Sequence, residues 1–86
     1  MALDMKREIL LLGLARDLAG DDRLTCELPQ NATVATVRTE LAGQYPHLAE
    51  LLPKCAIAVD HRYRQDTDEI GEDTLEIAVI SPVSGG

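Results

Sequence analysis

The apolar residues of this chain form short runs that are separated by polar, glycine or proline breaks. Residues 6–13 begin polar and then contain four consecutive aliphatic residues, a pattern that predicts a strand buried on both faces and central in a sheet. Residues 23–28 alternate polar and apolar, which predicts a second strand that ends at Pro29. The stretch 14–20 between them is too short for an independent helix and leads into a Gly-Asp-Asp turn. We therefore expect the two strands to pair as a hairpin.

A helical pattern follows. Thr33 is a good N-cap, and apolar residues then recur at spacings of three and four, at Val34, Val37, Leu41 and Tyr45. This predicts a helix over 34–45, which Pro46 closes. A short helical turn is expected within 47–52, before Pro53.

The last third of the chain returns to strand patterns. Residues 56–59 read as a buried strand, and residues 62–64 as a short strand after a turn at Asp60-His61. A turn at 71–73 precedes an alternating strand over 75–80. With the first and last strands adjacent and the helix across one face of a mixed sheet, the order predicts an α+β fold of the β-grasp type, familiar from ubiquitin. We expect residues 1–80 to form this domain and residues 81–86 to form a flexible tail.

Composition supports one small domain with an aliphatic core, because the chain has 86 residues, no Phe and no Trp. Eight basic and fifteen acidic residues give a net charge of −7, which argues against nucleic-acid and membrane partners. The acidic residues gather late in the chain, at Asp60, Asp66, Asp68, Glu69, Glu72, Asp73 and Glu76. They suit either a solubilising surface or a partner with a basic surface.

The two cysteines, Cys26 and Cys55, lie outside any CxxC pair and have no histidines at ligand spacing. We therefore expect neither a metal site nor a redox dithiol, and we interpret Cys26 as a small buried hydrophobe. The apolar run 9–15 is too short to span a bilayer and has no signal-peptide cleavage site after it. These features predict a cytoplasmic protein.

The chain ends in Gly85-Gly86. Glycine has no Cβ, so this tail can pass through a narrow channel into the active site of another protein. The terminal carboxylate is then the reactive group: attack on the α-phosphate of ATP makes an acyl-adenylate, from which sulfide or a thiol displaces AMP. A frayed terminus without a function is the alternative.

The sequence contains no evident catalytic constellation of its own. His47 and His61 are isolated, no Ser-His-Asp or Cys-His arrangement can be drawn, and no phosphate-binding GxxxxGK[ST] loop is present. We expect a carrier that binds no cofactor and whose partner enzyme uses the ATP.

Two segments resemble a known family, the small sulfur-carrying subunit of molybdopterin synthase. Residues 10–20, LLLGLARDLAG, are similar to the family's strand end followed by Arg, an acid, two apolar residues and Gly. Residues 80–86, ISPVSGG, are similar to its tail of an aromatic residue, Pro-Pro-Val, a small hydroxyl residue and Gly-Gly. Two departures stand out: Leu11, Leu12, Val79 and Ile80 replace residues that are often aromatic, and Ser81 replaces the first proline, which we expect to leave the base of the tail less rigid.

The resemblance implies a role for each part of the tail. Gly86 would carry the adenylate and then a thiocarboxylate, with Gly85 as a thin spacer. The threaded segment would comprise Ser81, Pro82, Val83 and Ser84. Ile80 and Tyr63 are candidates for an apolar docking patch, although ordinary sheet packing explains them equally well.

The implied partners are an E1-like adenylating enzyme, a sulfur donor and the large subunit of molybdopterin synthase, where the sulfur passes to a cyclic pterin precursor during molybdenum cofactor biosynthesis. Family precedent suggests a heterotetramer of two small and two large subunits. Three alternatives remain open: a thiamin-pathway sulfur carrier, a ubiquitin-like protein modifier, and a non-catalytic β-grasp adaptor whose tail is incidental.

Overall fold

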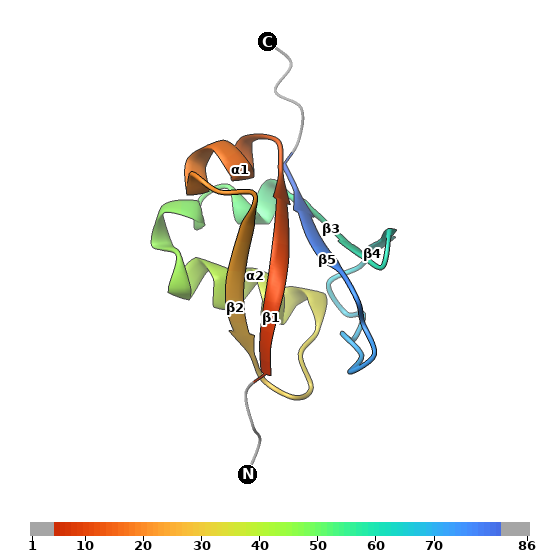
Figure 1. Cartoon of the computed structure of the whole chain (residues 1–86). Helices are drawn as coiled ribbons and strands as arrows, with labels where there is room; N and C mark the ends of the chain where they lie inside the picture. Colours follow the sequence, from red (N-terminus) through yellow and green to blue (C-terminus); the bar gives the residue numbers. More distant parts are fainter. Residues whose placement is uncertain (1–4, 82–86) are drawn as a thin grey trace.

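The computed structural model describes residues 5–81, and Figure 1 shows their arrangement. Five strands form one mixed sheet in the order β2-β1-β5-β3-β4, and α2 lies across one face of it. This is the β-grasp fold that the pattern predicts. In chain order the elements are β1 (Met5–Leu12), α1 (Leu14–Ala19), β2 (Arg23–Leu28), α2 (Val34–Gln44), the 3-10 turns η1 (Pro46–Leu48) and η2 (Leu52–Lys54), β3 (Ala56–Val59), β4 (Arg62–Arg64) and β5 (Ile77–Ile80).

The central strand of the sheet is β5, which runs parallel to β1 and antiparallel to β3. Three consecutive residues of β5, Ile77, Ala78 and Val79, are at most 4% exposed, so this strand is buried on both faces. The prediction of such burial for the first strand is wrong, because β1 alternates: Leu11 is fully buried whereas Leu12 is 38% exposed. Within residues 5–81, no helix covers the outer face of β1. The last strand is also shorter than predicted and begins at Ile77.

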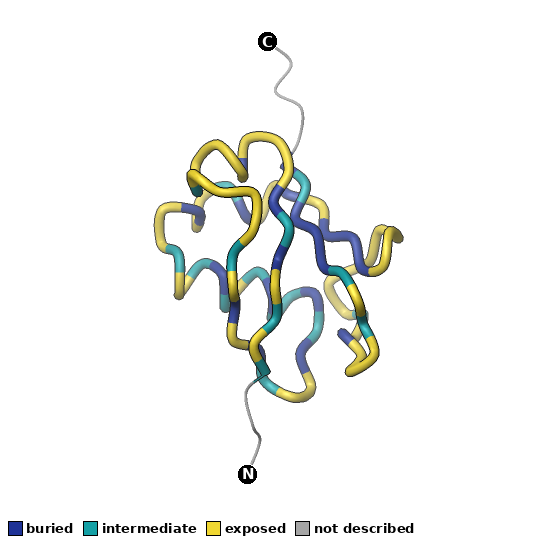
Figure 2. The backbone as a smooth tube through the Cα atoms, in the orientation of Figure 1, coloured by how far each residue is buried: buried dark blue, intermediate teal, exposed yellow. Residues whose placement is uncertain are grey.

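The core between α2 and the sheet is aliphatic, as the composition predicts. In Figure 2 buried positions alternate with more exposed ones along β1 and follow one another along β5. The helix contributes the predicted stripe of Val34, Val37 and Leu41, each fully buried, and Cys26 lies among them as a buried apolar side chain. Close packing of these branched side chains supplies most of the stabilising burial in the domain.

The start of α2 follows the sequence prediction. Thr33 Oγ1 accepts a hydrogen bond from the amide of Thr36 at 3.3 Å, and Thr36 Oγ1 accepts one from the amide of Thr33 at 3.0 Å. This reciprocal pair satisfies two amides at the helix start. The helix ends at Gln44, and Pro46 begins the next turn.

A second, short helix is present where the sequence analysis predicted none. Six residues form α1, which ends where Gly20 adopts a left-handed conformation (φ 76°) and donates its amide to the Arg16 carbonyl. A helix this short is unstable alone, so tertiary contacts must hold it. Ala15, which is 1% exposed, is its buried anchor.

The predicted turn between β3 and β4 is confirmed, with positive φ at both Asp60 and His61. Asp60 Oδ1 also accepts hydrogen bonds from the amides of Leu75 and Glu76, each at 2.8 Å. These two bonds lower the pKa of the Asp60 carboxyl and tie the loop before β5 to the hairpin. Among residues 5–81, no helix is long and apolar enough to cross a membrane.

Candidate functional site

The candidate site lies at the edge of the sheet where β1 and β5 both end. Because the two strands are parallel, Leu12 lies opposite Ile80 in the register, and Gly13 and Ser81 follow them at the same edge. Helix α1 starts here too (Figure 1). The predicted tail residues Pro82, Val83, Ser84, Gly85 and Gly86 lie outside the described residues, so their roles stay predictions.

Ser81 is placed differently from the sequence expectation. It is 5% exposed and belongs to the folded domain rather than to a free tail. Its hydroxyl donates to the carbonyl of Leu12 at 3.0 Å and accepts from the amide of Ala15 at 3.2 Å, and its own amide donates to the same Leu12 carbonyl. The expectation that serine leaves the base of the tail less rigid stays a prediction, and these three hydrogen bonds are contacts of Ser81 that the sequence analysis did not foresee.

The outer face of the sheet, opposite α2, carries a cluster of apolar residues, of which Leu12 and Tyr63 are exposed whereas Ala58 and Ala78 are at most 8% exposed. Side chains alternate between faces along a strand, so the residues between the core positions point outward. The strand register aligns them in two rows, of which one crosses β1, β5, β3 and β4 and the other crosses β1, β5 and β3. We call this surface the outer-face patch; it consists of Leu10, Leu12, Ala56, Ala58, Tyr63, Ala78 and Ile80.

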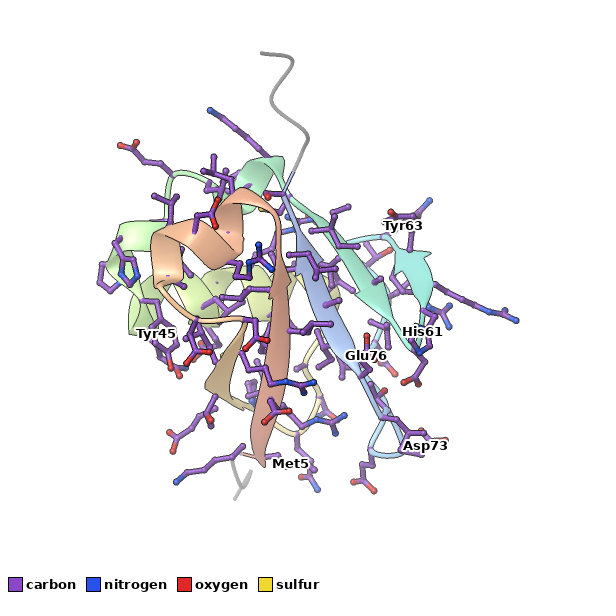
Figure 3. All side chains as sticks on the ribbon, turned by 45° about the horizontal axis from the view of Figure 1, so that its top comes forward. Met5, Tyr45, His61, Tyr63, Asp73 and Glu76 are labelled. Atoms are coloured by element: carbon purple, nitrogen blue, oxygen red, sulfur yellow. The ribbon has the colours of Figure 1, made fainter. Side chains whose placement is uncertain are left out.

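Both residues predicted for docking are in the outer-face patch. Ile80 is half-buried beside Leu12, and Tyr63 is 72% exposed on the edge strand β4, from which it projects in Figure 3. The sequence analysis did not identify the other five members. It had grouped Leu11 with Leu12, yet Leu11 is fully buried and only Leu12 can meet a partner. The twofold alternation along β1 was the signal that separates them.

Two ion pairs border the outer-face patch on the side away from Ser81. Arg23 pairs with Glu8 at 2.6 Å, and His61 Nε2 lies 3.7 Å from Glu76 Oε2. Figure 3 shows His61 and Glu76 at the end of the β3–β4 hairpin. Exposed pairs of this kind add little stability. An apolar centre with a charged rim is, however, the usual composition of a protein–protein interface.

The two cysteines are unsuited to sulfur chemistry. Cys26 is fully buried, and its burial raises the pKa of the thiol to about 11, so the thiol is protonated at neutral pH. Burial also raises the pKa of Cys55, which is 4% exposed. Across the described part of the chain, no three His, Cys, Asp or Glu side chains gather as a metal site.

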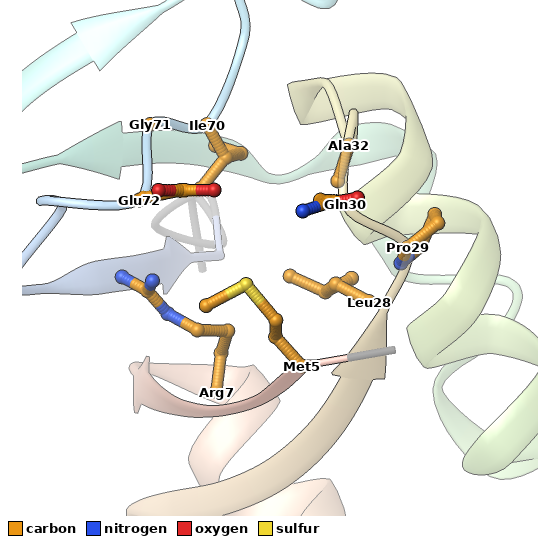
Figure 4. A pocket seen from close by; sticks show the side chains of 9 residues that line it. All are labelled: Met5, Arg7, Leu28, Pro29, Gln30, Ala32, Ile70, Gly71 and Glu72. Carbon is orange, nitrogen blue, oxygen red and sulfur yellow. The ribbon is translucent and has the colours of Figure 1, made fainter. Parts of the chain in front are cut away.

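A small pocket lies at the other end of β1, between Met5, Leu28 and Ile70 (Figure 4). Its volume is about 10 Å³, which is room for roughly one water molecule and for no metabolite. Arg7 and Glu72 point toward its rim. This pocket is therefore too small to hold a metabolite, and the edge of the sheet beside Ser81 is the better candidate.

Comparison with known proteins agrees with this geometry. The model of the ThiS family matches residues 9–86. The molybdopterin synthase sulfur carrier subunit of Arabidopsis thaliana is 33% identical over 79 residues, which cover 92% of this chain and 81% of that protein.

Two solved structures share the fold. SAMP1 of Haloferax volcanii, a small archaeal modifier protein, superimposes with a TM-score of 0.79 at 20% identity, covering 95% of this chain and all of that one. A chain from the Helicobacter pylori complex of subunits 1 and 2 of molybdopterin-converting factor superimposes with a TM-score of 0.62 at 19% identity. The match covers 95% of this chain and 100% of that one.

Proposed function

The chain belongs to the ThiS family of ubiquitin-like sulfur carriers, and on that premise we propose that it is the sulfur carrier subunit of a molybdopterin synthase. The Arabidopsis relative of that name supports the choice of pathway. The observation that carries the proposal is the parallel pairing of β1 with β5. This pairing brings the end of the folded domain to the same edge as the outer-face patch, so a partner that docks on the patch receives the tail.

In the first stage, the Gly86 carboxylate attacks the α-phosphate of ATP in an E1-like adenylating enzyme, forming an acyl-adenylate and releasing pyrophosphate. A persulfide on a sulfur donor then attacks the acyl carbon and displaces AMP, which leaves an acyl disulfide. A thiol of the donor system reduces that disulfide. The products are the Gly86 thiocarboxylate and a new disulfide on the donor system.

In the second stage, the large subunit binds the charged carrier and places the thiocarboxylate beside a cyclic pterin precursor. The thiocarboxylate sulfur attacks a carbon of the precursor and forms a thioester between carrier and pterin, while the carbon–oxygen bond at that carbon breaks and the oxygen leaves with a proton. Water hydrolyses the thioester at the acyl carbon, so the sulfur stays on the pterin and the Gly86 carboxylate is regenerated. Residues 5–81 contribute docking and positioning, and the chemistry occurs on the tail within the partner.

Partner binding should weaken as salt is added. The chain carries a net charge of −7, and complementary charge on a partner speeds association through interactions that ions screen beyond roughly 8 Å at physiological ionic strength. We expect the dissociation constant for the large subunit to rise by about tenfold between low and high salt, mainly through slower association. Surface plasmon resonance across a sodium chloride series measures both rates. A constant affinity would show that the outer-face patch alone drives binding.

The proposed function is tested by the mass of the C-terminal peptide. The full chain is produced in cells that contain its own adenylating enzyme and sulfur donor, and the peptide is isolated by proteolysis. We expect a mass increase of one oxygen-to-sulfur exchange located at Gly86. Peptide-level data are required because oxidation of Met or Cys adds nearly the same mass to the intact protein. A plain carboxylate throughout, with both partner enzymes active, contradicts the proposal.

The same experiment separates the related functions. Co-purification with a large synthase subunit supports the molybdopterin pathway, whereas co-purification with a thiazole-forming enzyme indicates the thiamin pathway. Isopeptide remnants of Gly86 on lysines of other proteins indicate a protein modifier. Activity that persists after deletion of Gly85 and Gly86 indicates an adaptor.

A further inference from the structure

One side chain ties the end of β5 to the junction between β1 and α1. The Ser81 hydroxyl bonds to the Leu12 carbonyl and to the Ala15 amide, residues that are distant from it in sequence. The Ser81 amide adds a third bond, to Leu12 at 3.3 Å. The last described residue is therefore held on both its backbone and its side chain.

The hydrogen bond from the Ala15 amide to Ser81 Oγ caps the start of α1, which the residues next to this helix do not do with their own side chains. Ala15 lies in the first turn of α1, where amides lack partners within the helix. The N-cap of α1 is Gly13, which has no side chain to accept from them. The amides of Arg16 and Asp17 use the Gly13 carbonyl, and the amide of Ala15 uses Ser81. Ser81 thus acts as an N-cap supplied from the other end of the chain.

Gly13 provides the space for this arrangement. A Cβ on Gly13 would lie 2.5 Å from Ser81 Oγ, and the residue has a φ of +70°, which side chains rarely adopt. The hydroxyl of Ser81 consequently occupies the volume that a side chain at position 13 would need. The two residues fit each other as a pair at the edge of the outer-face patch.

We propose that the Ser81 hydroxyl is a positioning group that fixes the point and direction from which the tail leaves the domain. The proposal rests on the proposed function, in which the tail must enter a partner that is docked on the outer-face patch. Leu12 and Ile80 belong to that patch and adjoin the anchor directly, so the anchor sets the origin of the tail relative to the docked partner. Without it, the end of β5 frays, and capture of the tail has to order an additional residue.

The test compares Ser81→Ala with Thr33→Ala in the full chain. Each variant removes a hydroxyl that accepts a hydrogen bond from an amide at the start of a helix. Thr33 caps α2, however, and does not lie at the end of β5, where the tail begins. Carrier-dependent exchange of pyrophosphate into ATP, catalysed by the adenylating enzyme, is measured over a range of carrier concentrations. For Ser81→Ala we expect about a tenfold loss of kcat/KM that falls mainly on KM, which is the entropic cost of ordering roughly one more residue. For Thr33→Ala we expect wild-type values while the protein remains folded.

Amide hydrogen exchange gives a readout that does not depend on any partner. Ser81→Ala should lower the protection of the amides of Ala15 and residue 81 beyond any change in global stability, and Thr33→Ala should not. Equal kinetics and equal protection in the two variants overturn the proposal. If wild-type carrier supports no pyrophosphate exchange, the proposed function fails, and the amide comparison still decides whether Ser81 anchors the strand end.

Discussion

Replacing Gly85 by valine should reduce sulfur transfer by more than about a hundredfold in kcat/KM, because a branched side chain next to the reacting carboxylate prevents entry into a narrow channel and misplaces the acyl carbon. Gly85 adjoins the terminal residue and lies outside the described residues, and the substitution changes no residue of the core or of the outer-face patch. Stability should therefore equal that of the wild type. The loss should affect both the adenylation and the final transfer to the pterin precursor.

The measurement is the rate of thiocarboxylate formation, followed by mass spectrometry of the C-terminal peptide. The matched control is Gly43→Val, which introduces the same change within α2, where a Cβ meets no atom within 4 Å. We expect this control to transfer sulfur at the wild-type rate. Turnover of Gly85→Val at the wild-type rate would contradict the idea that the tail passes through a narrow channel.

Replacing Leu12 by aspartate should weaken binding of the large subunit by about a hundredfold, because an interface would then bury an unpaired charge and lose an apolar contact. Leu12 is 38% exposed in the outer-face patch, beside Ile80 and next to the base of the tail. Its carbonyl still accepts the bonds from Ser81, since the change affects only the side chain. The fold should tolerate the aspartate, because the side chain at position 12 is partly exposed to solvent.

Isothermal titration calorimetry of the large subunit against Leu12→Asp measures this loss. Leu75→Asp is the control: it adds the same charge and removes the same side chain, but Leu75 is 92% exposed and lies outside the outer-face patch. We expect the control to bind as the wild type does. Equal weakening by the two variants would assign the effect to net charge, and no weakening by Leu12→Asp would exclude the patch as the docking surface.

Local patterns were enough to predict most elements of the fold. Apolar spacings of three and four after Thr33 predicted α2, and its observed bounds differ from the prediction by one residue at the end. The strand over 56–59 and the turn at Asp60-His61 were also predicted correctly. These elements depend on side-chain periodicity and on turn preferences, which act over a few residues and can be read from one segment at a time.

The errors occurred where a segment depends on a distant partner. The stretch 14–19 has too few residues to form a helix alone, and it becomes α1 because Ala15 is buried and its amide is bonded to Ser81. Similarly, an aliphatic run cannot show whether a strand is covered on both faces. That depends on its place in the sheet, which made β5 rather than β1 the strand buried on both sides.

The sequence by itself determined that this is a small β-grasp domain with an aliphatic core, and it identified Gly85-Gly86 as the candidate reactive end. Those conclusions follow from residue periodicity, composition and the chemistry of a terminal carboxylate. Only the tertiary structure decided which apolar residues face outward together and that Ser81 is an anchor instead of tail. Both depend on contacts between β1, α1 and β5, because strand register and a hydrogen bond across 66 residues arise only when distant segments pack together.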